Sequence, residues 1–223
     1  MNVSPQLLRL MQLASPALPV GTFAYSQGLE TGADMGVRDE AAASAWIFGV
    51  MEHGLTRLDL PILARMQAAW LDDDLPRIEH WSARLLASRE TAELRDEERQ
   101  TGAALARLLR DLGLEDAAAW IQSPKRTFGA LFSLAGARWS IGADALCAAY
   151  AFAWAENQVA AAIKLLPMGQ TGGQRILSRA AQRIPDLVEE ALGLEDDAVG
   201  GTAPGQVMAS ALHETQRTRL FRS

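Results

Sequence analysis

One segment limits what this chain can fold into more than any other. Residues 143–166 read ADALCAAYAFAWAENQVAAAIKLL, with ten alanines and apolar side chains on nearly every face of a helix. A helix of this kind lies either in a membrane or at the centre of a bundle. Glu156, Asn157 and Gln158 adjoin near its middle, and such polar groups are costly inside a bilayer. The segment is therefore predicted to be the buried core helix of a helical bundle.

The rest of the sequence favours the same fold class. Nearly half of the 223 residues are apolar, and strict alternation of apolar and polar residues is hard to find. We expect an all-α protein, with residues 1–223 forming a single domain around the helix at 143–166. Other helices are expected at about 5–14, 22–35, 40–57, from Pro61 to the turn at 72–74, 76–112 with one kink or break, 116–121, 127–140, 171–184, 185–192 and 206–217. A flexible acidic and glycine-rich loop is expected near 194–205.

Charge and cysteine content exclude several classes of protein. The formal net charge is −6 and no basic cluster appears, so a nucleic-acid partner is not expected. Cys147 is the single cysteine, which excludes an internal disulfide framework and fits a reducing compartment. The first residues lack the pattern of a signal peptide. We expect a cytoplasmic protein that does not enter a membrane.

The sequence offers no convincing metal or nucleotide site. The three histidines are far apart, and the run HETQR at 213–217 lacks the second imidazole of a zinc-protease motif. The glycine-rich run GQTGGQR at 169–175 lacks the lysine of a phosphate-binding loop and follows a helix instead of a strand. We therefore expect no catalytic, metal or cofactor site in this chain.

The opening stretch SPALPVGTFAYSQGLETG, residues 15–32, leaves an alternative open. AYSQG at 24–28 approximates the elbow that holds a nucleophilic serine, but that elbow needs a strand feeding a helix. A stand-alone helical serine hydrolase using Ser26 and a histidine is thus the weaker hypothesis, and a helical DNA-binding repressor is weaker still. We expect instead that Thr22 caps a helix through Met35, with Gln27 and Glu30 on its polar face.

Two other stretches suggest contact with a partner. No apolar side chain occurs in residues 95–102, so this stretch is expected to be exposed or docked, with Asp96–Arg99 and Arg95–Glu98 pairs. In the tail, arginines flank Leu220 and Phe221. Apolar residues near a chain end pack on their own domain or on another protein, and the sequence does not decide which.

These stretches together resemble the UreF-type urease accessory proteins. The similar motifs are SPALPVGTFAYSQGLE at 15–30, SRETAELRDEERQTG at 88–102, KLLPMGQTGGQR at 164–175 and HETQRTRLFRS at 213–223. Arg217 departs from the pattern, in which a tyrosine often follows HETQ. The motifs keep their order and extend over essentially the full chain, so the resemblance is strong although each motif alone is moderately specific.

The resemblance implies an all-α chaperone or scaffold that is not an enzyme. It would work with a GTPase and a second accessory scaffold of the UreD/UreH type to insert nickel into apo-urease, with GTP and nickel held by the partners. It would regulate the GTPase and form a homodimer. The resemblance places Lys164 and Arg219 on the GTPase surface beside Gln170 and Arg175. It gives the tail at 213–223 a docking role, with partner contacts at Phe221, Arg222, Gln27 and Glu30.

Overall fold

The computed structural model describes residues 4–223, which form helices joined by turns and extended segments, without a strand in that range. The predicted all-α fold is confirmed. In chain order the elements are α1 (Pro5–Leu13), η1 (Thr22–Ala24), α2 (Leu29–Asp34), α3 (Glu40–Val50), η2 (Met51–Asp59), α4 (Leu60–Leu71), α5 (Leu75–Ala87), α6 (Ala92–Asp111), η3 (Glu115–Trp120), α7 (Phe128–Arg138), α8 (Ala143–Leu165), α9 (Gln170–Leu192), η4 (Asp196–Ala198) and α10 (Pro204–His213).

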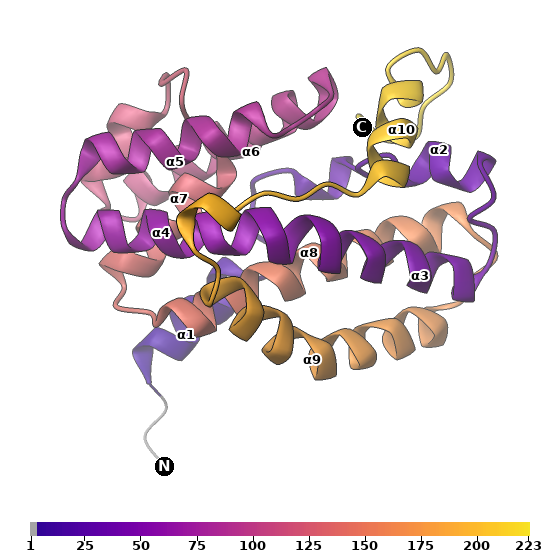
Figure 1. The fold of residues 1–223 in the computed structure, drawn as a ribbon, viewed down its shortest axis with the longest axis horizontal. Coiled ribbons are helices and arrows are strands. Elements are labelled where there is room, and N and C mark those ends of the chain that lie inside the picture. Colours follow the sequence, from indigo (N-terminus) through magenta and orange to yellow (C-terminus); the bar gives the residue numbers. More distant parts are fainter. Residues whose placement is uncertain (1–3) are drawn as a thin grey trace.

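Helix α8, the predicted core helix, runs through the middle of the bundle (Figure 1). It packs against α9 and α4 and also contacts α1, α2 and α3. Ala151, Ala155 and Ala162 are almost fully buried, and their small side chains let the neighbouring helices approach closely. A Cβ atom at Gly173 of α9 would lie only 2.7 Å from the Ile163 side chain of α8. Most of the apolar surface of α8 is therefore covered by protein.

A second group of helices packs at one end of the bundle. Helix α4 contacts α5 and α7, and α6 lies against α7 (Figure 1). The indole of Trp70 on α4 donates a hydrogen bond to the carbonyl of Ala130 on α7, over 3.0 Å. The predicted break in the stretch 76–112 lies between α5 and α6. No helix within residues 4–223 is long and apolar enough to cross a membrane.

The prediction of one helix from Thr22 to Met35 is wrong. Thr22 begins only the short η1, and α2 starts at Leu29. Between them, Gln27 and Gly28 both have positive φ angles, 52° and 86°, which a continuous right-handed helix does not allow. A Cβ atom at Gly28 would lie 2.8 Å from the backbone nitrogen of Ser210, so glycine is also required for the close approach of α10.

Pro61 lies in the first turn of α4, as predicted, but the prediction that this helix is separate from the one before it is wrong. Helices α3, η2 and α4 form one continuous rod (Figure 1), in which η2 is π-helical and the N–H of Leu60 bonds the carbonyl of Leu55. Pro61 lacks the N–H that would pair with the carbonyl of Arg57 in an α-helix. That carbonyl instead accepts a hydrogen bond from the N–H of Gly200, over 2.9 Å. A contact from a distant segment thus satisfies the group that the proline leaves unpaired.

Pro185 was expected to separate two helices, and the structure corrects this as well. It lies inside the uninterrupted helix α9 on the exposed side. A proline within a helix costs about 3 kcal/mol. Ile184, Leu187, Val188 and Ala191 surround it in sequence and are all buried, and burying such side chains contributes about 1.5–3 kcal/mol each for the larger ones. Packing therefore outweighs the lost hydrogen bond.

The segment predicted as a loop near 194–205 crosses the surface as an extended connection to α10 (Figure 1). Two arginines, Arg65 and Arg84, lie 5.3 and 5.2 Å from the ring of Trp81 and hold the segment. Arg65 Nε pairs with Asp196 over 2.6 Å, and Arg84 donates to the carbonyls of Asp196 and Val199. The segment is thus anchored at several points; its flexibility stays a prediction.

Replacing Arg84 by Ala is expected to loosen this segment without unfolding the bundle. The variant loses two hydrogen bonds to carbonyls, each contributing about 1 kcal/mol. Hydrogen exchange of the amides at 196–202 should then become about tenfold faster or more, while the amides of α4 and α8 are unaffected. An unchanged rate at 196–202 would show that the remaining contacts, those of Arg65 and of the Arg57 carbonyl, are sufficient to hold the segment.

Candidate docking surface

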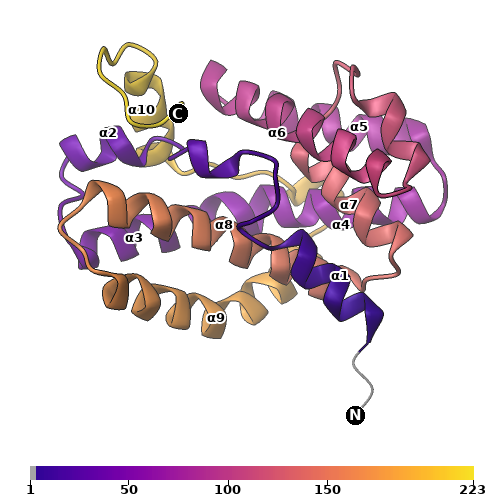
Figure 2. The ribbon, with the colours of Figure 1, turned by 180° about the vertical axis from the view of Figure 1, so that it is seen from behind.

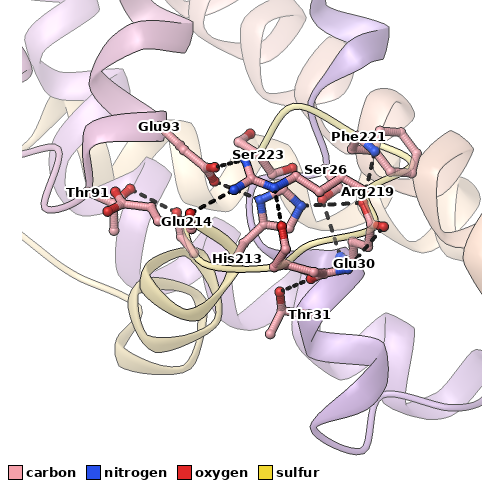
Figure 3. Close-up of polar contacts among 12 residues, drawn as sticks. Ser26, Glu30, Thr31, Thr91, Glu93, His213, Glu214, Arg219, Phe221 and Ser223 are labelled. Atoms are coloured by element: carbon pink, nitrogen blue, oxygen red, sulfur yellow. Dashed lines mark hydrogen bonds and ion pairs between the residues drawn. The ribbon is translucent and has the colours of Figure 1, made fainter.

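The last ten residues fold back onto the bundle instead of extending into solvent (Figure 3). After α10 ends at His213, the chain turns and lies between η1, α2 and the first turns of α6. Phe221 is 6% exposed and Ser223 is fully buried. We call the polar contacts that hold this segment the tail anchor: Ser26, Glu30, Glu93, His213, Gln216 and residues 219–223.

Glu30, in the first turn of α2, is the centre of the tail anchor (Figure 3). Its two carboxylate oxygens accept hydrogen bonds from the backbone N–H groups of Leu220 and Phe221, each with a donor–acceptor distance of 2.8 Å. Gln216 Nε2 donates to the same carboxylate over 3.3 Å. A carboxylate that accepts backbone N–H groups makes charge-assisted hydrogen bonds, which are about twice as strong as neutral ones. One side chain therefore fixes the direction of the tail.

Ser26 holds the final residue. Its backbone N–H and its hydroxyl both donate to the carbonyl oxygen of Ser223, over 2.8 and 2.5 Å. The N–H of Arg222 donates to the carbonyl of Ala24, so residues 222 and 223 both form backbone hydrogen bonds with the segment 24–26. Ser26 is fully buried, and the imidazole of His213 contacts glutamates instead of this hydroxyl. This geometry does not suit a catalytic nucleophile, which needs an accessible oxygen next to a base.

His213 and Arg219 meet at Glu93, near the start of α6 (Figure 3). The imidazole is fully buried, with Nδ1 at 2.7 Å from Glu93 Oε2 and Nε2 at 3.4 Å from Glu30 Oε2. Arg219 Nη1 donates to the other oxygen of Glu93 over 2.8 Å. Its remaining nitrogens donate to the carbonyls of Gln216 and Glu214 just after α10. Each of the three guanidinium nitrogens therefore donates one hydrogen bond within the chain.

Beneath the tail, Glu97 and Gln27 form a second group of polar contacts. Glu97 of α6 accepts a hydrogen bond from Gln27 Nε2 over 2.8 Å and lies 3.5 Å from Ser223 Oγ. Burial raises the pKa of Glu97 to about 8, and the nearby charge of Glu98 adds to this, against the hydrogen bond from Gln27. Trp154 of α8 donates to Gln27 from the opposite side, over 2.8 Å. Gln27 therefore links α8 to α6 beneath the tail.

The stretch 95–102 was expected to be exposed or docked, and this is only partly right. Glu97 and Glu98 are buried, and Glu98 pairs with Arg89 over 2.6 Å instead of with Arg95. The predicted contact of Asp96 with Arg99 is present at 3.5 Å. Glu98 is buried here because Arg89 neutralises it and the N–H of Phe128 bonds it.

The outer surface of the tail carries the cations predicted from the sequence. Lys164 at the end of α8 is exposed, and its Nζ lies 5.5 Å from the centre of the Phe221 ring. Arg222 is exposed and bonds Gln100 over 3.2 Å. Leu220, between the arginines, is 64% exposed. The structure thus brings Lys164, Arg219, Phe221 and Arg222 together, with Glu30 and Gln27 beneath them.

Two of the predicted residues lie apart from the tail anchor. Gln170 is exposed at the first position of α9. Arg175 forms a two-pronged ion pair with Glu40 of α3, at 2.9 and 2.5 Å, and this pair lowers the pKa of the Glu40 carboxyl. Arg175 therefore contacts α3 instead of the tail.

The roles of four residues in and beneath the tail anchor were not predicted from the sequence. Ser26 bonds the backbone of Ser223, and the other three are largely buried partners: Glu93, Glu97 and His213. The available signal was the density of charged residues at 88–102, although only the fold shows which of them face inward. Across residues 4–223, no group of three His, Cys, Asp or Glu side chains is arranged to hold a metal ion.

Comparison with known proteins shows the family to which the chain belongs. The UreF family model matches residues 37–181, more than half of the chain. The urease accessory protein UreF of Alkalilimnicola ehrlichii is 50% identical over 216 residues, covering 96% of this chain and 95% of its own. The protein of the same name from Pseudomonas putida is 49% identical over 225 residues, covering both chains completely. The chain therefore belongs to the UreF family of urease accessory proteins.

Proposed function

We propose that this chain is a non-enzymatic scaffold in the maturation of urease. It binds a GTPase and a second accessory scaffold of the UreD/UreH type, and the assembly inserts nickel into apo-urease. Nickel and GTP are held by the partners, and the chain acts in the cytoplasm as a homodimer without nucleic acid or membrane. The support comes from the family of the chain together with the ordered tail surface.

The observation that carries the proposal is the fixed position of the tail. Arg219, Leu220 and Arg222 face outward while Glu30 and Ser26 hold the backbone beneath them. Binding to a segment that is already ordered avoids much of the entropy that a free tail would lose. Met208 and Leu212 of α10 are more than half exposed and extend the surface with apolar area. Such a surface favours a partner with acidic groups around an apolar centre.

The engagement of Arg219 favours a gating role over direct activation of the GTPase. An arginine that reaches a bound nucleotide must present a free guanidinium. Arg219 already uses all its nitrogens on Glu93 and on two carbonyls within the chain. We therefore propose that Arg219 orders the tail, and that the ordered tail controls when the GTPase is recruited.

Size-exclusion chromatography with light scattering tests this function directly. The chain is run alone, with the second scaffold, and with the scaffold and the GTPase. We expect a dimer alone and a co-eluting complex with both partners. A chain that stays separate under all nucleotide conditions would contradict the proposal.

The Arg219→Ala variant distinguishes gating from activation. We expect that the variant no longer forms the three-component complex. We also expect that adding the wild-type chain or the variant to the isolated GTPase leaves its rate of GTP turnover unchanged. Arg110→Ala removes an exposed cation on α6, outside the tail anchor, and serves as the charge control. If the Arg219 variant still assembles but GTP turnover within the complex collapses, the arginine acts on the nucleotide and the gating role is wrong.

A further inference from the structure

A cavity of about 170 Å³ lies within the bundle, away from the outer face of the tail. Its walls come from η2, α6, α7 and α8, and the connection between α1 and η1 closes it on one side. Figure 2 shows this connection crossing the face of α8. A cavity of roughly 150 Å³ in another protein binds benzene, so the space fits a ligand of that size.

Aromatic side chains form much of the apolar wall. Phe23, Phe128, Phe132, Tyr150 and Trp154 all line the cavity. The rings of Phe128, Phe132 and Tyr150 form a cluster, with centres 5.3 to 6.0 Å apart. Groups of aromatic rings attract organic cations through the negative charge on the ring faces, and proteins use them to bind ammonium groups.

The polar wall of the cavity has an excess of carboxylates. Asp59, Glu97, Glu98 and Glu156 line it, with Arg89 as the one cation among its lining residues. Arg89 is fully occupied by Asp59 and Glu98, which both lie within ion-pair distance. Glu97 has only uncharged partners, Gln27 and the more distant Ser223 hydroxyl. A cation entering the cavity would therefore find one buried carboxyl group that no arginine or lysine of residues 4–223 contacts directly.

We propose that this cavity binds a small organic ammonium group, with Glu97 as its carboxylate partner and the aromatic side chains around its apolar stem. Anions are disfavoured by the excess of carboxylates. A metal ion is disfavoured because the stretch from residue 4 to residue 223 contains no cluster of metal ligands, and the aromatic wall offers no replacement for its water shell. The ammonium group can belong to a free amine or to a lysine side chain of a partner.

This site predicts a dependence of binding on pH. Glu97 is protonated at neutral pH because burial raises its pKa to about 8, so binding of a cation displaces its proton. The charged and titratable groups around it are Asp59 of η2, Arg89 before α6, Glu98 of α6 and Tyr150 and Glu156 of α8. Affinity should rise by up to about tenfold for each pH unit between 6 and 8 and then level off, because an alkylammonium stays charged over this range.

Isothermal titration calorimetry on the full chain tests the proposal. Benzylammonium is compared with benzyl alcohol, its uncharged analogue, and we expect at least about tenfold tighter binding of the cation, with release of close to one proton at pH 6.5. Glu97→Gln keeps the shape and the contact with Gln27, and it should remove both the preference and the proton release. Equal affinities for the two ligands, or an unchanged preference in the Gln variant, would overturn the proposal.

Three further binding measurements locate the site, identify the source of the ammonium group and test nickel as a competing ligand. Ala160→Trp, at an exposed position of the cavity lining, should block binding, whereas Ala181→Trp on the exposed side of α9 should not. Binding of Nα-acetyl-lysine amide as well as benzylammonium supports a partner's lysine, and binding of benzylammonium alone supports a free amine. Binding of Ni²⁺ that depends on Glu97, with no binding of either amine, would overturn the proposal.

Discussion

Glu98→Gln is expected to destabilise the protein by about 3 kcal/mol, a large fraction of the stability of an ordinary domain. Glu98 is almost fully buried and pairs with Arg89, while its second oxygen accepts the N–H of Phe128. Removing one charge from a buried pair leaves the partner charge uncompensated. Asp59 also contacts Arg89 and limits the loss. Urea unfolding at neutral pH measures the change.

Glu97→Gln, one residue earlier, is expected to act in the opposite direction. The pKa of Glu97 is about 8 in the folded protein, compared with 4.5 ordinarily, so the folded state keeps a proton that the unfolded state loses. The stability due to this group is complete below pH 4.5 and is lost as the pH rises to about 8, at up to about 1.4 kcal/mol per pH unit. The Gln side chain does not titrate, so the variant does not lose stability in this way. Its free energy of unfolding should therefore increase relative to that of the wild type as the pH rises.

Unfolding of the wild type and both variants at pH 5, 6.5 and 8 checks these expectations together. Titrations elsewhere in the chain affect all three proteins equally and cancel in the differences. A Glu97→Gln difference that does not change with pH would show that Glu97 is ionised in the fold. Equal losses in the two variants would contradict the assignment of Arg89 to Glu98.

Glu30→Ala is expected to free the tail while leaving the bundle folded. The variant loses the acceptor of two backbone N–H groups and of Gln216, with a cost to tail anchoring of about 3 kcal/mol. Trypsin cleavage after Arg217 and Arg219, followed by intact mass, should become roughly 100-fold faster, because cleavage follows the population of the open tail. In the proposed assembly, the same variant should no longer recruit the GTPase.

Glu40→Ala is the matched control for this experiment. It removes a glutamate that pairs with Arg175, which links α3 to α9 away from the tail. Its tail should be cleaved at the wild-type rate. If Glu30→Ala is cleaved no faster than this control, the contacts of Ser26 and Glu93 are sufficient to hold the tail and Glu30 is not its centre.

The helical fold and its central helix could be predicted from the sequence because they depend on local composition. The alanine-rich segment at 143–166 is apolar around its whole circumference, and only a bundle core accommodates it. The errors at Pro61 and Pro185 have one cause. Proline ends a helix by local rules, but contacts from Gly200 in one case and burial of the surrounding apolar residues in the other offset its cost.

The tail anchor could be predicted only in part. The motifs identified the stretches that meet there, and Arg219 and Arg222 of the tail are exposed, while their role in partner binding stays a prediction. The sequence did not indicate that Glu30 faces the tail backbone or that Ser26 is buried, because both depend on the left-handed turn at Gln27 and Gly28. Two adjacent residues with positive φ change the direction of every side chain that follows, and no periodicity reveals them.

The contacts of the tail anchor also relate to the order in which the chain is made. Ser26 bonds a residue 197 positions later, and Glu30 bonds one 191 positions later. During synthesis the domain's earlier helices can fold while Glu30 is still without its partners, since those partners lie about 190 positions later and emerge after them. A chain that stops before residue 219 lacks the outer surface of the tail altogether. A partner that binds this surface would thereby select chains that have been translated through the tail and have folded around it.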